Sequence, residues 1–348
     1  MTIGRRRVLC ISFLFFAALA VVLVLKEVVA PRLVRRRLIT EVQDNCKTCE
    51  LSLGRVQISL LPPALSSRHV RFTGGEQNAT VVSVEAERVY LPFSLLPLFK
   101  NHLRAGRIEV EQPVVKVKEG DLYASSSAKD SAARPHDLEI EGIEMKKASF
   151  VYVREYPGRA GSISVSRINA AVGPIGSSDR LRAADVEANA DGLLEESGRF
   201  HLQVRAKVFA KVPDVDVKLQ IAGQELAGMN KFFKANDGLE LHGLLIEGRG
   251  SSEIRGARLK SSAYVRYRGL GVKLKKNKER SALSAFFQNL LVSITSRKQN
   301  VKGGDYDRSG TVELERKTKE TIISFALRGM KEAAIKVTSQ GEKKKRKK

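Results

Sequence analysis

The chain has 348 residues, of which 43% are hydrophobic, and it carries a formal net charge of +23. This hydrophobic content is typical of folded proteins and excludes a chain that is disordered throughout. Aromatic residues make up only 6% and tryptophan is absent, which favours many thin strands over one thick core. The positive charge requires either a polyanionic neighbour, of which nucleic acid is the usual first candidate, or an explanation in terms of solubility.

The N-terminus predicts one transmembrane anchor over residues 8–30, behind a cytoplasmic segment at residues 1–7. The sequence is uncharged from residue 8 to residue 25, which is at the lower end of the length that spans a bilayer core. Basic residues and a proline follow this run, where a cleaved signal peptide would have small residues at its cleavage site. An uncleaved anchor is therefore expected, with these residues in the bilayer: Val8, Phe13, Phe16 and Leu25.

The orientation of this anchor does not follow from charge. Three arginines precede the apolar run at residues 5–7, and five basic residues follow it up to Arg37. The excess of basic residues on the cytoplasmic side, which usually sets orientation, also weakens for long translocated domains. The placement of the body outside the cytoplasm therefore depends on other features.

Two cysteines form the only close pair in the chain, Cys46 and Cys49 in the sequence Cys-Lys-Thr-Cys. In an oxidising compartment this pair is expected to form a structural disulfide, and the alternatives are two inert thiols or a redox motif. A zinc site needs four ligands, whereas the third cysteine lies in the predicted anchor and the five histidines are scattered singly. No metal site is expected.

From residue 51 onward, apolar and polar residues alternate with period two between glycines, prolines and asparagines, which predicts successive antiparallel strands. The clearest segments are Val56–Leu60, Val82–Ala86, Ile108–Glu111, Val114–Lys118, Phe150–Val153, Ile163–Ser166, His201–Ala206 and Val215–Ile221. Most of them have one apolar and one polar face, so the apolar face must pack against something. Either the sheet folds on itself as a sandwich, or it curls into a groove that holds an apolar ligand.

Helical segments are too few to cover such a sheet. Short helices are predicted near Pro92–Lys100 and Glu225–Ala235, and a longer one at Ser281–Ile294. The last helix, Lys317–Val337, has apolar residues on one side. Residues 125–137 are small and polar, and they indicate a flexible linker.

The order of motifs after the anchor resembles the AsmA-like family of envelope proteins. A Gly54-Arg55-Val56 strand leads to a Leu-Leu-Pro-Pro bend, and a strand containing Glu85-Ala86-Glu87-Arg88-Val89 and the segment Ser94–Leu98 (Ser-Leu-Leu-Pro-Leu) follow. A strand pair from Leu103 to Val117 completes this region. The C-terminal part is also similar, through Met229–Phe233, Ala285–Val292 and Val312–Arg316. Residues 121–220 match nothing in the family's pattern, and the chain is shorter than the larger members.

This resemblance implies an inner-membrane protein whose body lies in the periplasm. It implies a mainly β fold with a few helices, in which a curved antiparallel sheet forms an apolar groove and a C-terminal amphipathic helix follows. The implied function is binding of phospholipid, without enzymatic activity, in lipid transport or outer-membrane biogenesis. An alternative is a periplasmic scaffold or assembly factor that binds protein partners without carrying lipid, and a third is a nucleic-acid binder tethered to the membrane.

The resulting division of the chain has seven parts. They are the cytoplasmic segment 1–7, the anchor 8–30, an AsmA-like β region 31–120, a linker 121–137, a β-groove body 138–316, an amphipathic helix 317–338 and a basic tail 339–348.

The basic tail predicts contact with an anionic membrane surface, where each basic residue contributes about 1 kcal/mol. Nucleic acid is not expected as a partner, because no stacking aromatics or recognition element accompany the tail. The charged residues of the tail are Lys343, Lys344, Lys345, Arg346, Lys347 and Lys348.

Motifs for catalysis are missing from the sequence. It contains no glycine-rich phosphate loop, no Gly-X-Ser-X-Gly and no His-Glu-X-X-His. Asp214 and Asp216 alternate along a predicted strand as solvated residues do. Neither a catalytic residue nor a cofactor is therefore expected.

Overall fold

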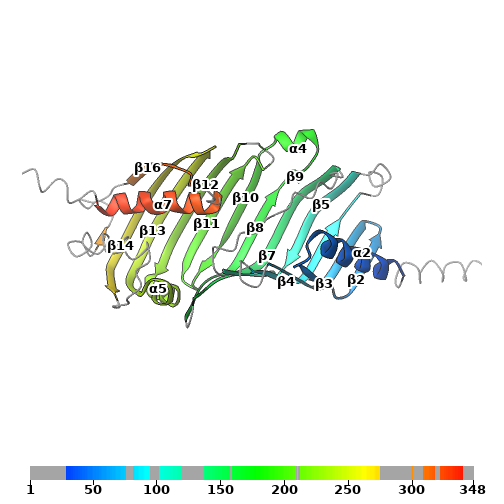
Figure 1. Cartoon of the computed structure of the whole chain (residues 1–348), viewed down its shortest axis with the longest axis horizontal. Helices are drawn as coiled ribbons and strands as arrows, with labels where there is room; N and C mark the ends of the chain where they lie inside the picture. The colour runs from blue at the N-terminus through cyan, green and yellow to red at the C-terminus, as the bar shows by residue number, and fades with distance from the viewer. Residues whose placement is uncertain are drawn as a thin grey trace, which may run out of the picture.

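The computed structural model describes residues 29–75, 81–94, 102–119, 137–156, 159–208, 210, 212–274, 299–300, 309–317 and 322–339. Their strands form one sheet of 16 strands (Figure 1). The strands are β1 (Glu50–Ser52), β2 (Val56–Leu60), β3 (Pro63–Gly74), β4 (Val81–Pro92), β5 (His102–Glu111), β6 (Val114–Glu119), β7 (Asp137–Tyr156), β8 (Arg159–Gly173), β9 (Ile175–Gly176), β10 (Val186–Leu194), β11 (Gly198–Ala206), β12 (Asp214–Glu225), β13 (Leu239–Arg255), β14 (Arg258–Leu274), β15 (Gln299–Asn300) and β16 (Ser309–Glu315).

The eight predicted strand segments all lie within strands of this sheet, because their period-two pattern matches a surface with one apolar and one polar side. The prediction that the sheet is antiparallel throughout was wrong. Both β5 and β6 pair in parallel with β7, so the sheet is mixed. The two short strands follow one another along the same long neighbour, separated by Gln112 and Pro113.

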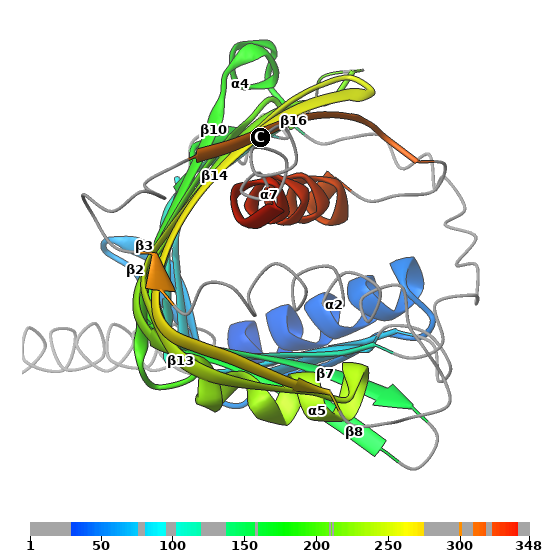
Figure 2. The same cartoon turned by 90° about the vertical axis from the view of Figure 1, so that its left-hand side faces the viewer.

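The sheet is curled into a C shape when viewed along its long axis (Figure 2). A series of backbone irregularities on neighbouring strands accounts for this curl. Four residues other than glycine have positive φ at successive positions across the sheet: His69 at 52°, Gln112 at 49°, Lys147 at 54° and Arg167 at 53°. The pairing between β7 and β8 shifts register at this line. Irregularities of this kind bend each strand and increase its twist, so a row of them folds the sheet.

The described helices are α2 (Ala30–Asn45), α4 (Asp179–Ala183), the 3-10 turn η2 (Leu226–Met229), α5 (Asn230–Asp237) and α7 (Ile322–Ser339). Both α2 and α7 lie on the concave side of the sheet (Figures 1 and 2). Helix α5 ends at Asp237, and the following residue, Gly238, adopts the left-handed conformation with φ of 66°. None of the described helices combines the length and the apolar character needed to cross a membrane.

The helix predictions have mixed outcomes. The helix near residues 225–235 is confirmed by η2 and α5, and the last helix begins five residues later than predicted, at Ile322. Residues 30–45, which were assigned to the end of the anchor and a β region, form α2 instead. Pro92 ends β4 in place of starting a helix, and Asp137, expected in the linker, begins β7. The predicted helix at 281–294 lies outside the described residues.

Candidate functional site

The concave face of the sheet is defined by which residues pair across neighbouring strands, because directly opposite residues point to the same side. One row of such pairs crosses twelve strands and contains no charged residue. This apolar row consists of Val56, Ser67, Val89, Val110, Met145, Ala170, Ala190, Leu202, Leu219, Gly250, Ala263 and Gly310.

The apolar row faces α7 at its C-terminal end, which places it on the concave side. A side chain at Gly250 would meet the sulfur of Met330 at 3.0 Å, and one at Gly310 would collide with the main-chain oxygen of Ala333. Since Met330 and Ala333 belong to α7 and α7 lies inside the curl, the whole row lines the concave face.

Under α7 the concave face is a closed core. Phe325 and Ile254 are fully buried and Leu259 is 2% exposed. Val215, Val217 and Leu314 pack around them from β12 and β16. This part of the apolar surface is already occupied by the chain itself.

Beyond α7 the same face is only half-buried. Most of the apolar side chains of β7, β8, β10 and β11 that share it retain an intermediate exposure, whereas Ala148 and Val186 are buried. The half-buried side chains are Met145, Phe150, Ile168, Val172, Ala190, Phe200, Leu202 and Val204. The concave face therefore presents an apolar surface that is accessible over its middle strands.

Near the end of these strands, α5 contributes a partial cover. The ring of Phe232 in α5 lies 5.9 Å from that of Tyr152 in β7, centroid to centroid, and 5.5 Å from that of Phe233. This aromatic cluster closes one margin of the accessible apolar surface.

The convex face is charged at positions where the apolar row carries no charge. A second row of pairs lies three residues along each strand from the apolar row, and therefore on the opposite face. Every one of its members over six strands is charged: Glu187, Arg205, Asp216, Glu253, Lys260 and Glu313. Oppositely charged neighbours occupy most of these positions, which is the arrangement expected on a solvated sheet surface.

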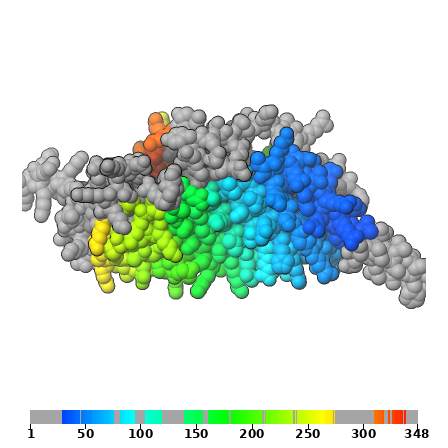
Figure 3. All heavy atoms as spheres, turned by 60° about the horizontal axis from the view of Figure 1, so that its bottom comes forward, coloured from blue at the N-terminus to red at the C-terminus, as the bar shows by residue number. Residues whose placement is uncertain are grey.

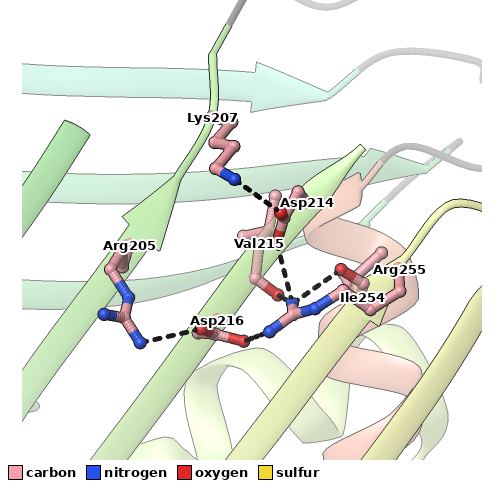
Figure 4. Close-up of polar contacts among 7 residues, drawn as sticks. All are labelled: Arg205, Lys207, Asp214, Val215, Asp216, Ile254 and Arg255. Atoms are coloured by element: carbon pink, nitrogen blue, oxygen red, sulfur yellow. Dashed lines mark hydrogen bonds and ion pairs between the residues drawn. The ribbon is translucent and has the colours of Figure 1, made fainter. Parts of the chain in front are cut away.

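Asp214 and Asp216 alternate along β12 on the convex face, and both belong to an ion-pair network at the ends of β11, β12 and β13 (Figure 4). Arg255 contacts Asp216 at 2.7 Å and Asp214 at 3.1 Å, and Arg205 contacts Asp216 at 3.3 Å. The hydrogen bond to Asp216 raises the pKa of the Arg255 guanidinium. A shallow hollow of about 540 Å³ beside the network is lined mainly by polar and charged residues of the convex face.

Cys46 and Cys49 are joined by a disulfide, with their Cα atoms 5.2 Å apart. The bond closes the turn between the end of α2 and the start of β1. It lies next to Gly74 of β3, at which a side chain would meet the Cys49 sulfur at 2.9 Å.

The other predicted site residues lie outside the described residues. They are the anchor positions Val8, Phe13, Phe16 and Leu25 and the basic tail from Lys343 to Lys348. Within the described part of the chain, no group of three or more His, Cys, Asp or Glu residues is placed to hold a metal ion.

The fold and this face define a single-sheet β protein with one apolar and one charged surface. Comparisons with protein-family models and with curated proteins find no match for the chain. The AsmA-like resemblance therefore stays an expectation drawn from the order of its motifs.

Proposed function

We propose that this protein is a membrane-anchored, non-enzymatic envelope protein that binds the acyl chains of phospholipid on its concave face and contributes to lipid transport or outer-membrane biogenesis. The observation that carries the proposal is the apolar row of uncharged residues whose middle members remain half-buried. Such a surface is disfavoured in water and marks a site for an apolar partner.

The energetic argument concerns the acyl chain. Exposing a methylene group to water costs about 0.8 kcal/mol, so a chain of about 16 carbons costs on the order of 12 kcal/mol. Neighbouring strands lie about 4.8 Å apart, so the five strands β5, β7, β8, β10 and β11 span about 19 Å. One acyl chain occupies half of a hydrocarbon core of about 30 Å, or about 15 Å. The accessible part of the concave face is therefore long enough for one chain.

The disulfide supports a place outside the cytoplasm. Disulfides persist in oxidising compartments, and Cys46 and Cys49 are bonded in the structure. A C-terminal fusion to a phosphatase that is active only outside the cytoplasm tests this part of the proposal. Activity of a matched cytoplasmic reporter in its place would contradict it.

Neighbouring positions in β11 give a matched test of lipid binding. Leu202 faces the concave side, whereas Gln203 faces the convex side and is exposed. A photoreactive phenylalanine analogue at Leu202, in the full chain within cell membranes, is expected to become linked to lipid. The same analogue at Gln203 is expected to give little lipid adduct, and mass spectrometry of the digested protein measures both.

The same experiment also distinguishes lipid binding from the alternative, a scaffold that binds protein partners. An accessible apolar face accepts an apolar polypeptide segment as readily as an acyl chain, because the hydrophobic effect is non-directional. Adducts to another polypeptide at Leu202, with no lipid adduct, would favour a scaffold or assembly factor. Equal lipid labelling at Leu202 and Gln203 would overturn lipid binding on the concave face.

A further inference from the structure

A second surface suited to lipid is found on α2, on the side of this helix that does not pack on the sheet. Residues three and four apart in a helix are neighbours on its surface, so Arg32, Leu33, Arg36 and Arg37 form one continuous patch. All four are exposed. Here this patch is called the basic face of α2.

The opposite side of α2 packs on the protein. Pro31 is buried, and Val34, Ile39 and Val42 are half-buried. The helix contacts β1 and β2 at the N-terminal end of the sheet. Figure 3 shows that residues of this blue, N-terminal part reach the surface at one end of the molecule. The basic face is therefore presented away from the sheet by a helix whose other side is held in place.

Leu33 is the least expected member of the basic face. Its side chain is 60% exposed, although an amphipathic helix normally turns its leucines toward the core. Val29, one turn earlier on the same side, is 38% exposed. Arginines surround both apolar residues, and this combination is typical of helices that lie in a membrane interface.

Helix stability does not account for the arginines. The N-terminus of a helix carries partial positive charge and favours acidic residues. The first turn of α2 has no acidic residue, and its arginines occupy the N-terminal half of the helix. An ion pair on this face, Arg37 to Glu41 at 3.4 Å, joins side chains that are 82% and 59% exposed. Such a pair contributes little.

We infer that the basic face of α2 docks on the surface of a membrane containing anionic phospholipid, with Leu33 inserted among the headgroups and Arg32, Arg36 and Arg37 bound to their phosphates. Guanidinium groups bind phosphate in bidentate fashion, which suits three arginines on one face. This inference rests on the proposed function in placing the protein beside a membrane, and it adds the headgroup class that the protein meets there.

The absence of tryptophan from the chain provides a clean probe. A Leu33→Trp variant of the full chain, reconstituted in vesicles, carries a single tryptophan on the basic face. In phosphatidylcholine vesicles containing phosphatidylglycerol, its emission is expected to shift to shorter wavelength and to be quenched by brominated lipid. Both effects should weaken in phosphatidylcholine alone and on addition of salt, which screens the contact.

Two further sets of variants complete the test. In the Leu33→Trp background, each of Arg32→Gln, Arg36→Gln and Arg37→Gln is expected to lower the ratio of docked to free helix about fivefold, since one basic residue near an anionic surface contributes about 1 kcal/mol. Val212→Trp, at a position 61% exposed in the turn between β11 and β12, serves as the control and should stay unquenched.

Three outcomes would overturn the inference. They are equal quenching with and without anionic lipid, quenching unchanged by the arginine substitutions, and an emission change caused by an oligonucleotide but not by vesicles. Failure of the proposed function has a different readout, because the photoreactive residue at Leu202 reports lipid on the concave face independently of α2.

Discussion

The hydroxyl of Ser252 in β13 donates a hydrogen bond to the main-chain oxygen of Ala326 in α7, and the two atoms are 3.1 Å apart. Ser252 is 1% exposed, and its oxygen also lies 2.9 Å from that of Ser261 in β14. Two small hydroxyl side chains thus let the helix approach the sheet closely while their polar atoms stay paired. The position of α7 on the concave face is set by specific contacts in addition to apolar burial.

Replacement of Phe325 by alanine should destabilise the protein by about 3–5 kcal/mol, because the ring is fully buried and its loss leaves a cavity. Chemical denaturation followed by circular dichroism measures this change. Leu327→Ala on the same helix is the matched control, since Leu327 is 56% exposed, and it should change stability by less than about 0.5 kcal/mol. Similar losses for the two variants would show that α7 is not docked as described.

Gly310 is expected to tolerate no side chain. A Cβ there would collide with the main-chain oxygen of Ala333, which cannot move without displacing α7. Gly310→Ala should therefore lower the thermal midpoint and increase proteolysis of α7. The comparison is Gly248→Ala, whose Cβ would meet only Leu245 at 3.6 Å, an ordinary contact. A Gly310→Ala protein as stable as the Gly248→Ala protein would contradict the close packing of α7 on β16.

The backbone at Lys147, where φ is 54°, predicts an unusual order of stability among substitutions at this position. Left-handed backbone is costly for side chains branched at Cβ, so Lys147→Val should destabilise the protein by about 1–2 kcal/mol. Lys147→Gly should be tolerated, because glycine adopts this conformation without strain. Lys116→Val in β6, an exposed position in the regular part of the sheet, should have little effect. Denaturant midpoints that rank glycine below valine at position 147 would refute this account of the curl.

Glu240 should titrate at lower pH than an unperturbed glutamate. A hydrogen bond from Lys234, 2.9 Å away, lowers the pKa of Glu240 from 4.5. The stabilisation from this contact is thus present above pH 4.5 and is lost as the pH falls through the lowered pKa. Lys234→Met should raise the Glu240 pKa toward 4.5, measured by NMR titration, and Lys231→Met on the same helix should leave it unchanged. A Glu240 pKa equal in the wild type and the Lys234→Met variant would disprove the contact.

The sequence was sufficient to predict individual strands, because apolar alternation such as that of Val215–Ile221 in β12 is a local property. It was insufficient to predict their orientation. A hairpin is the default between consecutive strands, but the parallel pairing of β5 and β6 with β7 depends on how the chain returns to the sheet.

The choice between a sandwich and a curled sheet was also beyond the sequence. Between β3 and β8 the curl coincides with positive φ at His69, Gln112, Lys147 and Arg167, and none of these is a glycine that would signal the bend. Further along the sheet, in β13 and β14, the positive φ values fall on Gly243 and Gly269. The basic face of α2 escaped notice for another reason. In the sequence, its arginines look like the charges that flank a membrane anchor. Pro31 in the first turn and the apolar residues Val34 and Val42 are nevertheless signals of a packed helix.

The closed core beneath α7 limits how far a ligand could extend along the concave face. For an acyl chain lying along the apolar row, the path is accessible over β7 to β11 and ends at Met330 of α7, which lies over Gly250. At the other end of the row, Val56 and Ser67 are also buried, where α2 contacts β1 and β2. Under the proposed function, lipid would therefore enter and leave over the middle strands. Passage from one end to the other would require α7 to leave the sheet, so onward transfer would depend on whatever displaces that helix.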